Sequence, residues 1–325
     1  TNEPQHHLGK AMLFLLLAMC FFLPPAALDA SGPAVSPSDA TPPKPPANEA
    51  PAKTGLIQEG NYFVLYIKGT PVTEPGWTEL KKQKFFIDDS GHATAKMELS
   101  GNIWRFFKYN PKTSSWKKQR DLWEPVSTKL YYFNKSGNCT KVYDTETERL
   151  KVRKNGKMRL ARRAVSSLND GKLYYFQKNG ARDTSAGWKK ASSSELYCVH
   201  KKGYVTSKML ASKNTFRYYT YQYRESKWKK QRDVWKSVDG KKYYFNKSGK
   251  CTRIYNPDTK KCQRYQDGKM AAVKNGLCRL PNGKLYYFNA KGIRITQKGW
   301  QEVSEYQYLQ LGKKGYITAK LEKKG

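Results

Sequence analysis

A repeat of 112 residues runs along most of this chain. The phrase WKKQRDLW at 116–123 returns as WKKQRDVW at 228–235, and YYFNKSGNCT from Tyr131 returns as YYFNKSGKCT from Tyr243. The same offset, one residue shorter near its start, fills residues 60–325 with about two and a third copies. Self-similarity at a fixed period is typical of arrays of stacked units rather than of one globular core. We therefore expect a repeat architecture over 60–325.

Each copy is built from shorter units in which a turn sequence precedes an aromatic strand. DGKLYYFQKNG, DGKKYYFNKSG and NGKLYYFNAKG place an Asp-Gly or Asn-Gly turn before the aromatic run and a second Gly-containing turn after it. Such runs predict β-hairpins, and helix signals are nearly absent. Five units fit into 112 residues, so the array should hold about twelve hairpins of roughly 20 residues. A lone hairpin is only marginally stable in water. The sequence therefore predicts an all-β solenoid of stacked β-hairpins, packed by the aromatic residues that make up 14% of the chain.

The first 59 residues have a different character. Residues 11–23, AMLFLLLAMCFFL, form an apolar run shorter than the roughly 20 residues that a membrane-spanning helix needs. We interpret 1–30 as a signal peptide, with an uncleaved membrane anchor as the alternative. Residues 31–54 are rich in Pro, Ala, Ser and Thr and hold too little apolar surface to fold. The expected division is a signal peptide at 1–30, a Pro-rich disordered linker at 31–59 and the array at 60–325, with no stable membrane span after signal cleavage.

The unit pattern resembles a known family. The pattern is Gly-Trp, a polar spacer, an aromatic Tyr-Tyr-Phe-like strand, then Asn-x-x-Gly and a short strand. It is similar to the cell-wall-binding repeats of Gram-positive surface proteins, of the choline-binding and glucan-binding type, and to repeats of clostridial toxin receptor-binding regions. The resemblance is strongest at 188–209, 235–252 and 282–321. It implies a hairpin solenoid that binds its ligand between adjacent hairpins.

The resemblance also indicates which aromatic residues bind ligand. In the choline-binding branch, a cage of aromatic rings holds the quaternary ammonium. In this chain the residues at one cage position of successive units are not aromatic: they are Leu130, Leu173, Lys242 and Leu285. Their replacement disfavours choline binding, but stacking of a sugar ring on the remaining aromatic residues is still compatible with the sequence. The predicted ligand-binding residues are Trp77, Trp123, Trp188, Trp235, Trp300, Tyr132, Tyr175, Tyr244 and Tyr287. The alternative for each is that it packs in the core between hairpins.

Net charge indicates the class of partner. The chain has 61 Lys and Arg against 26 Asp and Glu, a formal charge of +35, spread along the array. Such a surface attracts polyanions, and for an exported bacterial protein these are teichoic acids and other anionic envelope glycans. The alternative is that lysine keeps strand edges soluble. A basic groove lined by Tyr and Phe also suits nucleic acid, but the predicted export argues against it, so no nucleic-acid partner is expected.

Nothing in the sequence predicts an enzyme. Of the four histidines only His92 and His200 lie outside the signal region, and no nucleophile is paired with a base. No catalytic residue, metal ligand or cofactor is therefore predicted. The five cysteines outside the predicted signal peptide are uninformative, because an odd number leaves at least one thiol free. A local disulfide loop between Cys251 and Cys262 is only the alternative.

These observations predict a non-catalytic, secreted or cell-surface protein, associated with the cell wall. It would bind a cell-wall polymer, teichoic acid or choline-like, or an extracellular polysaccharide, through aromatic seams between hairpins. A glucan-binding adhesin, a toxin-like carbohydrate-binding repeat and a basic nucleic-acid-binding repeat are the alternatives.

Overall fold

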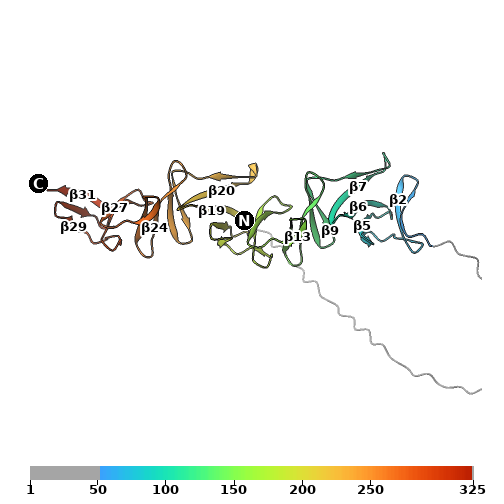
Figure 1. Ribbon diagram of the computed structural model, residues 1–325, viewed down its shortest axis with the longest axis horizontal. Helices are drawn as coiled ribbons and strands as arrows, with labels where there is room; N and C mark the ends of the chain where they lie inside the picture. The colour runs from blue at the N-terminus through green and yellow to red at the C-terminus, as the bar shows by residue number, and fades with distance from the viewer. Residues whose placement is uncertain (1–51, 324–325) are drawn as a thin grey trace, which may run out of the picture. The chain divides into compact units, whose positions relative to one another are not determined.

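The computed structural model describes residues 52–323, which are almost entirely β-structure (Figure 1). This part of the chain holds 31 strands and one short 3-10 helix, η1 (Tyr223–Glu225). Every strand pair in it is antiparallel, and the strands of each sheet pair in chain order. No helix in 52–323 has the length and hydrophobicity required to cross a membrane. The predicted signal peptide and linker residues up to 51 lie outside the described residues.

The first copy of the repeat forms three sheets, which we name sheets A, B and C, of three, five and five strands. The bounds in sheet A are β1 (Gly55–Glu59), β2 (Tyr62–Ile67) and β3 (Thr70–Pro71). Those in sheet B are β4 (Gly76–Leu80), β5 (Gln83–Ile87), β6 (Ala93–Ser100), β7 (Ile103–Asn110) and β8 (Ser115–Lys118). Those in sheet C are β9 (Leu122–Val126), β10 (Lys129–Phe133), β11 (Cys139–Asp144), β12 (Arg149–Lys154) and β13 (Lys157–Leu160).

The second copy repeats this order as sheets D, E and F, again of three, five and five strands. Sheet D contains β14 (Ala164–Ser167), β15 (Leu173–Phe176) and β16 (Arg182–Asp183). Sheet E contains β17 (Gly187–Lys190), β18 (Glu195–Val199), β19 (Val205–Ser212), β20 (Thr215–Gln222) and β21 (Lys227–Lys230). Sheet F contains β22 (Val234–Val238), β23 (Lys241–Phe245), β24 (Cys251–Asn256), β25 (Lys261–Gln266) and β26 (Lys269–Ala272).

The third, partial copy forms sheets G and H. Sheet G pairs β27 (Gly276–Arg279) with β28 (Leu285–Phe288). Sheet H contains β29 (Gly299–Ser304), β30 (Gln307–Leu311) and β31 (Ile317–Glu322). The 112-residue period is therefore one set of three sheets.

Two expectations about the units are corrected. Most units are sheets of three or five strands rather than pairs of strands, because tight turns continue one hairpin into the next. Gly101 and Asn102 between β6 and β7 have φ values of +55° and +61°, and Asn155 and Gly156 between β12 and β13 have +51° and +75°. Two-residue turns with positive φ match the strand twist and keep the ladder continuous.

The second correction concerns the start of the array. β1 lies inside the expected linker 31–59, since Gly55–Glu59 pairs with Tyr62–Tyr66 in continuous register. Leu56 of β1 packs against a buried cluster that contains Leu65 and Phe85, and this apolar contact offsets the entropy of ordering the segment. The folded array begins at about Gly55.

Aromatic packing closes the junctions between sheets. Seven buried clusters are found in the described residues, and each joins two sheets that are consecutive in the chain. Phe106 of sheet B and Phe133 of sheet C stack with centroids 5.6 Å apart, and Tyr218 of sheet E lies 5.7 Å from Phe245 of sheet F. The last residue of each Tyr-Tyr-Phe motif is 0% exposed: Phe133, Phe176, Phe245 and Phe288. Full burial of one such ring stabilises the fold by roughly 1.5–3 kcal/mol.

The alternative of a disulfide loop between Cys251 and Cys262 does not form. Cys262 lies opposite Tyr255 in the register of β24 and β25, which places it four residues along β24 from Cys251. Its Sγ instead contacts the Sγ of Cys278 at 2.7 Å, between sheets F and G. All five cysteines of the described part of the chain are free thiols.

Candidate functional site

The nine predicted ligand-binding residues lie in three environments. Four form two equivalent Trp–Tyr pairs, Trp123 with Tyr132 in sheet C and Trp235 with Tyr244 in sheet F. Trp77, Trp188 and Trp300 begin the second sheet of each copy. Tyr175 and Tyr287 are buried, at 5% and 8% exposure.

The two Trp–Tyr pairs have almost the same geometry. Trp123 on β9 lies opposite Tyr132 on β10, with ring centroids 5.3 Å apart and an interplanar angle of 42°. Trp235 and Tyr244, on β22 and β23, are 5.4 Å apart at 46°. All four rings are partly exposed. Each pair therefore offers an apolar surface that water reaches.

A cation from the third strand of the sheet covers each pair. The Nζ of Lys141 lies 5.3 Å from the Tyr132 ring centroid and 5.8 Å from that of Trp123. Arg253 takes the equivalent place, with its Cζ 4.1 Å from Tyr244 and 5.8 Å from Trp235. Such contacts contribute about 0.5–1 kcal/mol at exposed sites. The position in which an aromatic cage would hold a ligand cation is thus close to the protein's own cation.

Hydrogen bonds hold the tyrosine of each pair and, in sheet C, the lysine over it. The Tyr132 hydroxyl donates to Asp121 Oδ1 at 2.7 Å, and the Tyr244 hydroxyl donates to Asp233 Oδ1 at 2.5 Å. These bonds raise the pKa of both phenols, with burial adding to the effect. Lys141 donates to the Ser167 hydroxyl at 3.2 Å, and burial lowers its pKa. The aromatic pairs are therefore held in place before any ligand binds.

The Gly-Trp residues differ in exposure. Trp77 lies 6.2 Å from the buried Phe106, and Trp188 lies edge-on to the equivalent Tyr218 at 5.9 Å, so both pack partly into the core. Trp300 is 50% exposed. Tyr218 belongs to the fourth strand of sheet E, and sheet H has only three strands in the described residues, so Trp300 has no equivalent cover.

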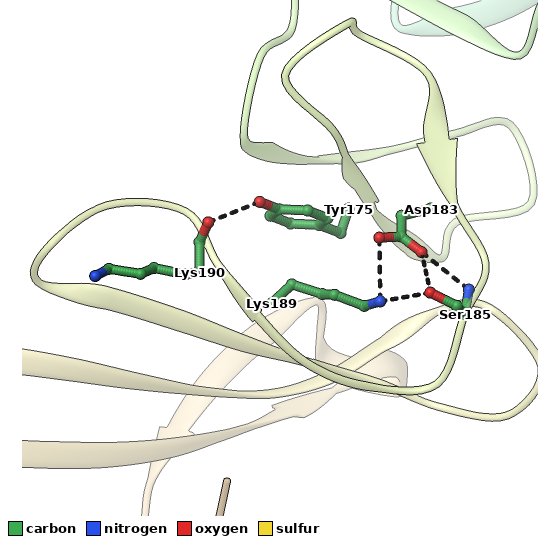
Figure 2. A network of polar contacts seen from close by, with 5 residues as sticks. All are labelled: Tyr175, Asp183, Ser185, Lys189 and Lys190. Atoms are coloured by element: carbon green, nitrogen blue, oxygen red, sulfur yellow. Dashed lines mark hydrogen bonds and ion pairs between the residues drawn. The ribbon is translucent and has the colours of Figure 1, made fainter.

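Tyr175 contributes to a polar network that joins sheets D and E (Figure 2). Its hydroxyl donates to the backbone oxygen of Lys190 at 2.9 Å. Nearby, Asp183 is 8% exposed, accepts from the Ser185 amide at 3.0 Å and forms an ion pair with Lys189 at 3.1 Å. Burial alone would raise the pKa of Asp183, but the hydrogen bonds from Ser185 and Lys189 outweigh it and lower the pKa below its usual value. Tyr175 is therefore a packing residue at a sheet junction.

The sequence interpretation missed a second set of aromatic residues. Lys96 lies over the Trp116 ring at 4.7 Å, and Lys208 lies over the equivalent Trp228 at 4.5 Å. Both tryptophans are on the last strand of a five-stranded sheet, at the start of the repeated WKKQRD phrase. The phrase is thus the junction between two five-stranded sheets, with one tryptophan on each side. Both tryptophans of the phrase recur 112 residues later, and this recurrence could have identified Trp116 and Trp228 from the sequence.

The comparison with protein families matches the segment that contains the Trp235–Tyr244 pair. Residues 235–251 match the family model described as a putative cell wall binding repeat. The equivalent residues 123–139 are identical to this segment at 11 of 17 positions. The resemblance to cell-wall-binding repeats is therefore confirmed for the segment that carries one of the two aromatic pairs.

Several solved structures are similar to this chain at low identity. Alternansucrase in complex with isomaltononaose is 16% identical, over 81% of this chain and 16% of that protein, with a TM-score of 0.24. CbpJ from Streptococcus pneumoniae is 17% identical, over 81% and 86% of the two chains, with a TM-score of 0.22. Choline binding protein F from the same organism is 18% identical over the same shares, also at 0.22. TM-scores this low do not establish a shared fold. No curated protein matches this sequence.

Proposed function

We propose that this chain is a non-catalytic attachment protein, secreted or held at the cell surface, that binds a cell-wall polymer or an extracellular glycan. One observation carries the proposal: the segment that matches a cell wall binding repeat contains the partly exposed Trp235–Tyr244 pair. The same pair, with a cation in the same place, recurs at Trp123 and Tyr132. The description of the matching family supports attachment to the wall.

The sheets are proposed to form a solenoid. The seven junction clusters support this, because each sheet shares its buried residues with the sheets next to it in the chain. In such an array, stability is a sum of units and nearest-neighbour interfaces, and equivalent surface sites recur at regular intervals. A repeated weak site suits a repeated polymer, because binding at one site raises the effective concentration at the next.

A glycan suits the aromatic pairs better than choline does. The rings of Trp123 and Tyr132 offer an apolar face on which a sugar ring stacks. A quaternary ammonium would have to approach Lys141, whose Nζ already lies 5.3 Å from Tyr132, and two like charges repel at that range. The aromatic cage position of choline-binding repeats is also Leu130 in sheet C and Lys242 in sheet F. The proposed ligand is therefore a glycan or an anionic wall polymer.

A sedimentation assay tests this function. The full chain is mixed with insoluble bacterial cell walls, with the same walls stripped of teichoic acid, and with insoluble glucan, each at low and high salt. We expect retention on untreated walls. Loss on stripping together with sensitivity to salt would identify the anionic polymer as the ligand, whereas salt-resistant retention on glucan would favour the glucan-binding alternative.

Two outcomes would overturn the proposal. Failure to bind walls and glucan at any salt concentration would remove the attachment function. Retention of DNA in a gel-shift at moderate salt, without wall binding, would instead favour the basic nucleic-acid-binding alternative. Bovine serum albumin and a lysine-rich protein of similar charge serve as controls for non-specific adsorption.

A further inference from the structure

Two grooves lie at repeat-equivalent places, one on sheet C and one on sheet F. The sheet F groove has a volume of about 600 Å³ and a floor of Phe216, Tyr243, Ile254 and Met270. The sheet C groove has about 560 Å³ and a floor of Trp104, Tyr131, Val142 and Met158. Each floor residue of one groove lies 112 positions from its counterpart in the other. The duplication shows that the groove is a regular part of the repeat.

Strand alternation explains how the groove forms. Tyr243 pairs with Ile254 across β23 and β24, so both side chains are on one face of sheet F. Phe216, on β20 of sheet E, closes one end, with its ring 5.7 Å from that of Tyr243 at an angle of 78°. Tyr244, the next residue on β23, is on the opposite face. The groove is therefore separate from the Trp235–Tyr244 pair of the proposed attachment site.

Unpaired cations surround the floor of the sheet F groove. Lys213, Lys241, Lys261 and Lys269 line it, all four are exposed, and no Asp or Glu lines it. None of them forms an ion pair with another residue of 52–323. Lys213 lies in the turn between β19 and β20 of sheet E, and Lys261 and Lys269 lie on β25 and β26 of sheet F, so both sheets that line the groove contribute positive charge. Four like charges around an apolar floor form a site that an anion stabilises.

The apolar floor of the groove indicates which uncharged groups the anionic ligand contains. Tyr243 and Ile254 are each only 8% exposed, and Phe216 lies edge-on to Tyr243. Such a floor presents aliphatic groups and ring edges, whereas the planar bases of nucleic acid need an open ring face. Small units rich in C–H groups, with negative charge at both ends, fit the floor and the lysines together.

We propose that both grooves bind a polymer in which phosphodiesters alternate with sugar or polyol units. The sugar or polyol lies on the apolar floor and the phosphates lie among the lysines. The sheet F groove is the stronger of the two, because four cations and no acid line it, whereas Lys129, Arg149 and Lys151 share the sheet C groove with Asp144. The proposal rests on the attachment function above and names the polymer class that it recognises.

Binding of purified poly(glycerol phosphate) to the full chain, followed by calorimetry over a range of salt concentrations, tests the proposal. The double variant Lys261→Gln with Lys269→Gln should bind about tenfold more weakly, and its salt dependence should fall by nearly two released counterions. The matched control is Lys247→Gln with Lys260→Gln, which removes the same charge from exposed positions outside the groove. The control should change affinity less than about twofold.

Exchanging the acidic residue of one groove for the amide of the other tests which groove binds the polymer more strongly. Asn256 lines the sheet F groove where Asp144 lines the sheet C groove. Asn256→Asp should weaken binding several-fold, and Asp144→Asn should strengthen it. Circular dichroism shows whether each variant is folded, and a variant that does not fold is replaced by Lys261→Ala alone, which alters only an exposed side chain.

Three results would overturn the groove proposal. One is an equal loss in the groove variant and in its control. Another is unchanged binding in the groove variant while the wild type still sediments with walls, which would leave the attachment function standing. The third is competition by single-stranded DNA that equals competition by the phosphate polymer. If the wild type binds neither walls nor glucan, the attachment function itself is wrong.

Discussion

Sheets C and F are the same five-stranded unit, 112 residues apart, and they differ mainly where they meet solvent. The Trp–Tyr pair, the buried Phe and the Met of the groove floor are unchanged between them. At the groove, Asp144 becomes Asn256, Arg149 becomes Lys261 and Lys151 becomes Gln263. The contrast teaches that the aromatic pair and the buried Phe keep the same residues in both copies, whereas the charged residues of the groove vary.

The sheet junctions show a second contrast. Leu150 of sheet C fills the place that Cys262 takes in sheet F, and both are fully buried. The Asp183 network between sheets D and E has no equivalent in the first copy, where Val72 occupies the place of Asp183. Junctions of the same geometry are thus closed by different interactions.

The largest expected effect tests whether the two copies are equivalent in packing. Phe133→Ala and Phe245→Ala should each lower the free energy of unfolding of their region by about 3–5 kcal/mol, because each empties a fully buried position. Hydrogen exchange with mass spectrometry should show faster exchange in the mutated sheet and in its neighbours. Costs that differ by more than about 2 kcal/mol would break the equivalence.

Asp183→Asn should lower the free energy of unfolding by about 2 kcal/mol, because it leaves Lys189 partly buried without its partner. The pKa of Asp183 is lowered, so its contribution is present above the usual Asp pKa and lost as pH falls through the lower folded value. Urea unfolding at neutral and acidic pH measures this. The variant and the wild type should converge in acid, and a constant difference would contradict the assignment.

The aromatic pairs should act together in binding. Trp123→Ala or Trp235→Ala alone should weaken sedimentation with cell walls by a few-fold, and the double variant by about tenfold or more, since two linked weak sites reinforce each other. Trp→Phe at the same positions keeps an aromatic ring and serves as the matched control. Complete loss of binding from one single variant that stays folded would contradict a distributed site.

The smallest effect concerns the cations over the pairs. Lys141→Met with Arg253→Met removes both charges and should change stability by no more than about 1 kcal/mol per site. Freed of these charges, the pairs should show saturable quenching of tryptophan fluorescence by choline, which the wild type should lack. Equal quenching in both proteins would show that the cations do not occupy the site.

The repeat predicted much of this structure. Period, turn sequences and aromatic runs predicted all-β units, and strand alternation explains why Phe133 is buried beside a partly exposed Tyr132. The number of strands in each sheet was not predictable in this way, because it depends on turns such as Asn155–Gly156 that join one hairpin to the next. The local sequence of such a turn does not show whether the ladder continues.

The candidate site was predictable only in part. Trp123 and Trp235 could be chosen from the family pattern, but Lys141 and Arg253 could not, because the pattern specifies no charged residue on the short strand that follows Asn-x-x-Gly. The grooves were missed for a related reason. Their floors combine residues of two sheets, such as Phe216 with Tyr243, and sequence spacing alone does not bring these together.

Hydrogen exchange of the full chain, with and without soluble wall fragments, tests the central claim most directly. If equivalent surfaces of the two copies bind the polymer, protection should appear at residues 122–133 and 234–245 in parallel as ligand is added, with little change in sheet A. Protection confined to one copy, or spread evenly over all sheets, would contradict the account.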